Sequence, residues 1–169
     1  MPFTLPRTEL LDQNVLSTIK GLTTGNGFQI TLNGVQLDDP DNPEIPADLL
    51  AVIAPGDDLH YPDSDTPEDQ TPIGAIAWYR PYDIIIYLLK SQIKPDLSFR
   101  TWANIVRAEV EKCMLADRGR GTDTNGVTVA QDTYCRGVIT FGPPDDARGI
   151  IVRFQVRYWT NDEDPYNPH

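Results

Sequence analysis

Carboxylate side chains are concentrated in one proline-rich part of this chain. The stretch from Asp38 to Asp69 holds eleven Asp or Glu residues and six prolines, and no Lys or Arg occurs between Lys20 and Arg80. Carboxylates at this density can bind calcium or act as general acid and base. Their spacing decides between these two kinds of site and a solvated loop.

The start of this stretch offers oxygen ligands for calcium. Five suitable side chains fall within seven residues: Asp38, Asp39, Asp41, Asn42 and Glu44. A calcium loop needs ligands at defined alternate positions and a glycine at its sharp turn. Pro40 and Pro43 interrupt that spacing, and no glycine stands where the turn requires one. We therefore expect a solvated loop without a metal ion.

Two carboxylate pairs, Asp57–Asp58 and Asp63–Asp65, raise the question of a glycosidase. Such a pair needs a fixed separation and one carboxyl group with a raised pKa. Neighbouring aspartates on a proline-rich loop are more typical of hydrated surface. The histidines, His60 and His169, lie in the acidic stretch and at the last residue, where no predicted element would orient a base. We expect no enzyme activity, no catalytic residue and no cofactor.

The charge and the cysteines narrow the classes further. The formal net charge is −11 and the sequence pI is about 4.4. Proteins that bind DNA gather Lys and Arg against its phosphates, so we expect no sequence-specific DNA binding. Cys113 and Cys135 match no zinc-ligand spacing, and Cys113 falls on the apolar side of a predicted helix, so we expect a reduced, buried thiol. No signal peptide and no membrane-spanning apolar run is seen, which predicts a soluble protein that contacts no membrane.

Two helices must organise the chain. Apolar residues at spacings of three and four predict an amphipathic helix over residues 7–22, with the stripe Leu11, Val15, Ile19 and Leu22. A second helix is predicted over 98–117, with Ser98 as N-cap. Its apolar face comprises Phe99, Trp102, Val106, Val110, Cys113 and Met114.

Strand patterns fill the remainder. Alternation over 28–32 predicts a half-buried strand followed by a tight turn at Asn33–Gly34. The apolar run at 49–55 predicts a strand covered on both faces, and Pro81 predicts a kink, a bulge or the end of ladder pairing. Further strands are expected at 127–130, 136–141 and 150–159, before a frayed tail at 160–169. The chain is thus predicted to be one α/β (α+β) domain over 1–169, a mainly antiparallel sheet flanked by two helices, with acidic proline-rich loops over 38–72.

Several short patterns occur in a familiar order. The first helix ends at Gly25-Asn26-Gly27-Phe28, a proline-bearing connection leads to the strand AVIAPGDD at 51–58, and WANIVRAEVEKCMLAD at 102–117 forms the later helix. A glycine-rich turn and the strand VRFQVRYWTNDEDPYNP close the chain. This order resembles the tail terminator proteins of long-tailed bacteriophages, also called tail completion, minor tail or head–tail joining proteins. The acidic loops at 38–48 and 57–72 are longer than is usual in that family.

The resemblance implies a structural role in the virion. Members of that family form a sixfold ring on the last ring of tail-tube subunits, stop tube polymerisation and present a surface to the connector at the head. The implied partners are therefore other copies of this chain, the tail-tube protein and the head–tail connector or stopper. The family has no catalytic residues, and DNA passes its lumen without specific binding. Assembly in the host cytoplasm and a place in the virion tail or neck are implied.

Two other classes stay open. One is a tail-tube or head–tail stopper subunit, which also forms rings but does not end the tube. The other is a carbohydrate-binding or hydrolase accessory module that uses the acidic loop and exposed aromatic side chains. A carboxylate pair facing a cleft would favour the module, and a ring with an open channel would favour assembly.

Arginines on the last strand are candidates for an interface. Arg153 and Arg157 project from the face opposite Val152, Phe154, Val156 and Tyr158, because strand side chains alternate. They pair either with a carboxylate of a neighbouring strand or with the 38–69 segment of an adjacent subunit.

The second pairing would need apolar help. Ordering a loop costs about 1 kcal/mol per residue, more than exposed charge pairs return. Ile45, Leu59 and Tyr61 are the expected apolar anchors. Arg118 and Arg120, at the end of the second helix, either cap that helix or join the same interface.

Overall fold

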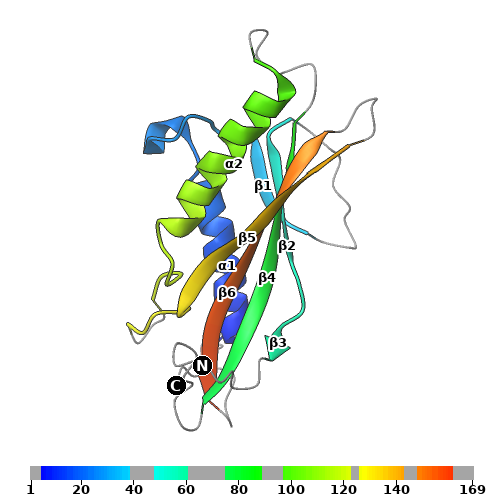
Figure 1. The fold of residues 1–169 in the computed structure, drawn as a ribbon. Helices are drawn as coiled ribbons and strands as arrows, with labels where there is room; N and C mark the ends of the chain where they lie inside the picture. The colour runs from blue at the N-terminus through cyan, green and yellow to red at the C-terminus, as the bar shows by residue number, and fades with distance from the viewer. Residues whose placement is uncertain are drawn as a thin grey trace.

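The computed structural model describes residues 5–38, 48–60, 75–88, 97–122, 126–142 and 148–161. Two α-helices, α1 (Arg7–Lys20) and α2 (Phe99–Leu115), lie on the same side of one sheet (Figure 1). A short 3-10 helix, η1 (Thr24–Asn26), follows α1 and ends at Gly27, whose positive φ of 84° suits glycine. Ser98 caps α2 as predicted, since its side chain accepts a hydrogen bond from the Thr101 N–H at 3.1 Å.

Six strands form a mixed sheet, so the predicted α+β class is confirmed. They are β1 (Gly34–Leu37), β2 (Leu50–Pro55), β3 (Leu59–His60), β4 (Ala75–Tyr87), β5 (Asp132–Phe141) and β6 (Gly149–Asn161). The order across the sheet is β1-β2-β4-β6-β5, and β3 pairs with β4. Only β1 and β2 run parallel among the described pairings; the others are antiparallel.

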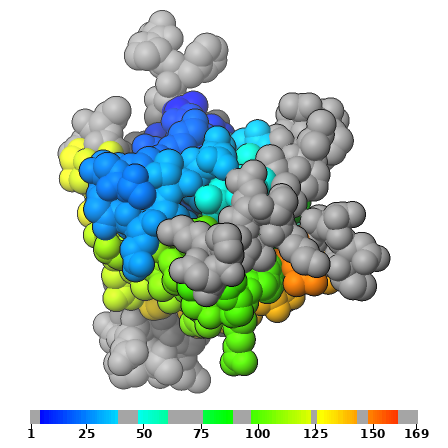
Figure 2. All heavy atoms as spheres, turned by 90° about the horizontal axis from the view of Figure 1, so that it is seen from above, coloured from blue at the N-terminus to red at the C-terminus, as the bar shows by residue number. Residues whose placement is uncertain are grey.

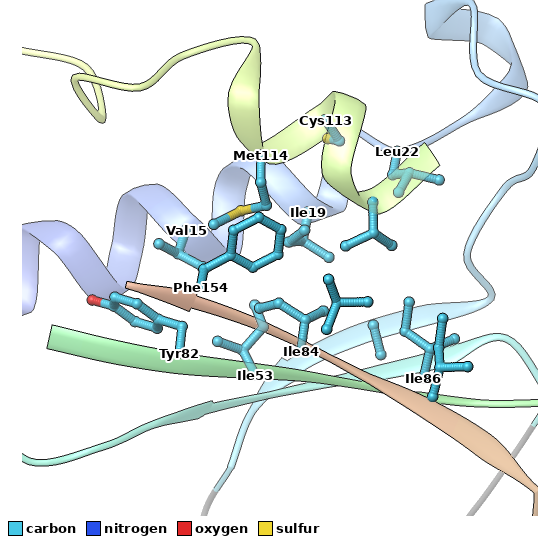
Figure 3. Packing of buried hydrophobic residues seen from close by; sticks show 14 of the residues in the cluster. Val15, Ile19, Leu22, Ile53, Tyr82, Ile84, Ile86, Cys113, Met114 and Phe154 are labelled. Carbon is cyan, nitrogen blue, oxygen red and sulfur yellow. The ribbon is translucent and has the colours of Figure 1, made fainter. Parts of the chain in front are cut away.

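The core lies between the helices and one face of the sheet (Figure 3). The predicted stripe on α1 is confirmed, because all four of its residues are fully buried: Leu11, Val15, Ile19 and Leu22. Across from them lie side chains of the central strands, among them Ile53, Ile84 and Phe154. The predicted burial of β2 on both faces is also confirmed, because its first four residues are all buried.

Both cysteines are free thiols, as predicted from their spacing. Cys113 is buried on α2, and its Sγ donates to the Thr18 carbonyl of α1 at 3.2 Å. Burial raises the pKa of the Cys113 thiol, so it stays protonated at neutral pH.

Pro81 neither kinks nor bulges β4, but it marks the end of one ladder, which was one of the three predicted alternatives: the β2–β4 pairing ends at Pro55 and Tyr82. The β4–β6 register runs without a shift from Ala75 to Tyr87. The carbonyl of Pro81 accepts a hydrogen bond from Gly56, just beyond the end of β2. The side of Pro81 that lacks an N–H therefore faces the end of β2, where the ladder has no bond to lose.

Residues 28–32 form no strand, and this prediction was wrong. The Gln29 N–H donates to the buried carboxylate of Glu109 on α2 at 2.9 Å, and the Thr24 N–H donates to the Thr31 hydroxyl at 2.9 Å. Side chains thus satisfy backbone groups that a ladder would pair. In Figure 2, the N-terminal part of the chain (blue and cyan) lies at the surface next to segments that come later in the sequence (green).

Asn33–Gly34 is not a hairpin turn, so that prediction was also wrong. The Asn33 N–H donates to the Leu49 carbonyl, and its side-chain amide donates to the Asp48 carbonyl at 2.8 Å. Asn33 therefore leads directly into β1, which pairs in parallel with β2.

Residues 127–130 form an irregular segment with a single bridge between Thr122 and Thr128, not the predicted strand. Arg7, buried at the start of α1, donates to the carbonyls of Thr128 and Val129. Arg7 stands four residues before Leu11 and so continues the buried stripe of α1. Its guanidinium binds carbonyls that a strand partner would otherwise take.

Candidate interaction surface

One face of the sheet, here called the outer face, is turned away from α1 and α2 (Figure 1). Alternation places Tyr79 and Asp83 of β4 and Arg153 and Arg157 of β6 on this face. Their intervening neighbours, such as Phe154, point into the core. The register sets Asp83 opposite Arg153 and Tyr79 opposite Arg157. The outer face thus brings together the two arginines predicted as interface residues.

Arg153 is exposed, as predicted, and pairs within the subunit. Its Nε lies 3.1 Å from Oδ1 and 3.2 Å from Oδ2 of Asp83, and half of its side chain remains accessible. An exposed pair of this kind contributes about 0–1 kcal/mol to folding. Of the two pairings that the sequence left open, the one within the subunit is therefore present. Because this pair contributes little to folding, Arg153 can exchange Asp83 for a carboxylate of another subunit at a small cost in free energy.

Arg157 is buried, which corrects the predicted exposed basic face. Only 7% of the residue is accessible, and its guanidinium carbon lies 5.9 Å from the ring centres of both Tyr79 and Trp159. Large aromatic neighbours on the same face cover it, and alternation alone does not reveal such cover. Reversing its charge would disturb folding as well as any interface.

A second group of arginines meets Tyr134 of β5 on the same face. Arg118 lies 5.8 Å and Arg136 lies 5.4 Å from the Tyr134 ring centre. Arg118 also makes a two-bond contact with Asp132 at 2.5 and 2.8 Å. The predicted interface residue Arg118 is therefore at the surface. Arg136 joins it, although no sequence pattern singled it out.

Arg120 is fully buried, so the prediction that it is an interface residue was wrong. The other alternative, that it caps the second helix, is the one that the structure shows. Its guanidinium donates to the carbonyl of Met114 at the end of α2 and lies 3.6 Å from the Met114 sulfur. Burial lowers the pKa of Arg120, an effect that the charge of Asp117 opposes. Its φ of 55° lies in the left-handed region that commonly ends helices.

We expect Arg120→Ala to lower the free energy of unfolding by about 2–4 kcal/mol, because it empties a buried site and leaves the Met114 carbonyl without its donor. Arg118→Ala, two residues away and exposed, should change it by less than about 1 kcal/mol. Urea denaturation of both variants measures the difference. Equal stabilities would mean that Arg120 is not part of the folded core.

The three predicted apolar anchors have different outcomes. Leu59, on β3, is 50% exposed and available for contact. Ile45 and Tyr61 lie outside the described residues.

A cluster of partly buried polar groups joins α1 to the sheet. Arg80 donates to both carboxylate oxygens of Asp12, through Nε at 2.9 Å and Nη2 at 2.8 Å, and its Nη1 donates to Asp58 at 3.1 Å. The Tyr82 hydroxyl donates to Asp12 at 2.6 Å. We call these four residues, with Tyr158 beside Asp58, the Arg80 cluster.

The pKa values of Arg80 and of both tyrosines in this cluster are raised. Burial by itself lowers the pKa of Arg80, but its hydrogen bond to Asp12 and the surrounding charges raise it overall. Burial raises the pKa of Tyr82, and the charge of Asp12 raises it further. Burial and the charge of Asp58 raise the pKa of Tyr158 in the same way. Both phenols remain neutral at physiological pH.

The cluster bears on the carboxylate pairs considered for catalysis. Asp57 is exposed, whereas Asp58 is bonded to Arg80. One oxygen of Asp58 is therefore already occupied within the subunit, whereas a glycosidase pair presents both carboxyl groups to the substrate. Asp63, Asp65 and His169 lie outside the described residues, and His60 is exposed with its ring 5.5 Å from that of Trp78.

No three His, Cys, Asp or Glu side chains within the described ranges gather as a metal site requires. Of the calcium ligands considered, only Asp38 belongs to those ranges. Neither α1 nor α2 is long and apolar enough to cross a membrane. No protein-family model matches the chain, and no curated protein matches it in sequence.

Proposed function

We propose that this protein is a ring-forming virion subunit that caps the tail tube of a long-tailed bacteriophage. It would end tube polymerisation and join the tail to the head connector from its place in the tail or neck. The observation that carries the proposal is the element order: a helix, four strands of the sheet, a second helix and a closing pair of antiparallel strands. It follows the order on which the resemblance to tail terminators rests, except that the first strand is β1 and not the strand expected at 28–32.

Two further features support an assembly role. The sheet is open, and in the described residues its border strands are β1 and β5. Open borders and an exposed charged face are common points of contact between subunits. Leu59 and Ile139 add exposed apolar side chains, at 50% and 43% accessibility.

The charge suits a channel that DNA traverses. A net charge of −11 per copy repels the phosphate backbone, so DNA would pass without being held. The same charge opposes assembly of the free protein, because neighbouring copies repel one another. Assembly would therefore depend on salt or on contact with the tube end.

We expect self-association to strengthen as ionic strength rises from about 0.01 M to about 1 M, because the Debye length falls from about 30 Å to about 3 Å. Contacts at bonding distance are screened less than the long-range repulsion. Sedimentation velocity should show a shift from monomer toward a species of six copies. A monomer at every salt concentration, with and without tube ends, would contradict the proposal.

A further inference from the structure

A hollow of about 490 Å³ lies in the middle of the outer face. Two arginines, Arg136 of β5 and Arg153 of β6, line it together with Asp83 and Gln155. Ala54 and Pro81 contribute apolar lining next to these polar groups. The hollow therefore combines an apolar floor with two guanidinium groups, on a protein that is otherwise strongly acidic.

A bulge in β5 lies at the hollow and places Arg136 in its lining. The register shifts between Cys135 and Gly137, so Arg136 is the extra residue beside the position where Gly137 pairs with Arg153. Gly137 has a φ of 148°, and a Cβ there would meet nothing within 4 Å. The glycine permits the bulge and leaves the space above it open.

Both guanidinium groups are held in a way that keeps donors available. The described hydrogen bonds of Arg153 use only Nε, toward Asp83. Those of Arg136 also use only Nε, which donates to the Gln155 side-chain oxygen at 2.7 Å. The terminal nitrogens of an arginine suit a carboxylate, which they bind with two parallel hydrogen bonds. With two arginines and one aspartate, the hollow carries an excess of positive charge.

We propose that this hollow binds an acidic, proline-containing segment from a second copy of the chain, the stretch at 61–74. That stretch carries four carboxylates and three prolines without a single Lys or Arg. Its carboxylates suit the two arginines, and its prolines suit the apolar floor. The proposal rests on the ring, since the ring is what sets one copy beside the next.

A peptide tests the site apart from the ring. We expect a fluorescein-labelled peptide of residues 61–74 to bind the full-length protein in fluorescence anisotropy. Binding should weaken with salt and with a peptide whose Asp and Glu are replaced by Asn and Gln. The double variant Arg136→Ala/Arg153→Ala should bind about tenfold more weakly or worse. Arg107→Ala, an exposed arginine on α2 paired with Glu111, is the matched control and should bind like the wild type.

The results separate the two proposals. No binding to the wild type, or equal binding by the double variant, overturns the site. Tighter binding of an oligothymidylate at the same arginines would also overturn it, by assigning the hollow to phosphates. If the peptide binds but no rings form, the site stands and the ring fails. If the double variant still forms rings, the ring stands and the site has no part in it.

Discussion

Asp12→Ala is expected to lower the free energy of unfolding by about 3 kcal/mol. The carboxylate accepts three hydrogen bonds, two from Arg80 and one from Tyr82. The side chains of Asp12 and Arg80 are only 13% and 14% exposed. Removing one partner of a buried ion pair typically costs about 3–5 kcal/mol. We expect the lower end of that range, because Asp58 still neutralises Arg80.

Asp57→Ala is the matched control, since Asp57 is exposed and adjacent to the cluster. It should change stability by no more than about 0.5 kcal/mol. Equilibrium denaturation in urea compares the two variants. A loss of the same size in both would show that the Arg80 cluster does not fix α1 to the sheet.

Alkaline pH should unfold the protein steeply. The pKa values of Tyr82 and Tyr158 are raised in the folded state above the ordinary value of about 10. Their contribution to stability is complete below about pH 10. Above that pH the unfolded chain loses protons that the folded chain keeps, so stability falls as pH rises. Two such groups give a slope of about 2.7 kcal/mol per pH unit.

Tyrosine variants identify the groups responsible. Tyr82→Phe should lower the slope by about 1.4 kcal/mol per pH unit and Tyr82→Phe/Tyr158→Phe by about 2.7. Some slope should remain, because burial also raises the pKa of Cys113, Cys135 and Tyr134. Urea midpoints measured at successive pH values above about 10 give the slopes. A double variant that keeps the slope of the wild type would mean that other groups control alkaline unfolding.

Spacing patterns within single segments correctly predicted those features of the fold that each segment determines by itself. The stripe of α1, the cap and apolar face of α2, and the alternation of β6 all came from spacing alone, and each is present. These features follow from helical and strand periodicity, which neighbouring residues determine. Their packing together into one α+β layer arrangement follows from the need to bury both apolar faces.

The errors came where distant side chains bind the backbone. Glu109 binds the N–H of Gln29, 80 residues away, and Arg7 binds carbonyls of Thr128 and Val129 more than 120 residues away. No local pattern records such partners. One signal was present in the sequence: Arg7 continues the spacing of four that leads through Leu11, and a charged residue on an apolar stripe must find a partner.

The candidate surface was predicted in part. Alternation correctly placed Arg153 on the outer face, but it could not show that Tyr79 and Trp159 cover Arg157. Arg136 depends on a bulge, for which Gly137 within a strand pattern was the only hint. Surfaces assembled from several strands depend on register, which one strand's sequence does not contain.

The central claim is that copies of this chain close into a ring with an open channel. Negative-stain electron microscopy of the purified protein at about 1 M salt, where the Debye length is about 3 Å, tests it most directly. The proposal predicts sixfold rings that do not stack into tubes. Monomer-sized particles alone, both in the purified protein and after it is mixed with tube ends, would contradict the ring, and continuous tubes would contradict a terminating role.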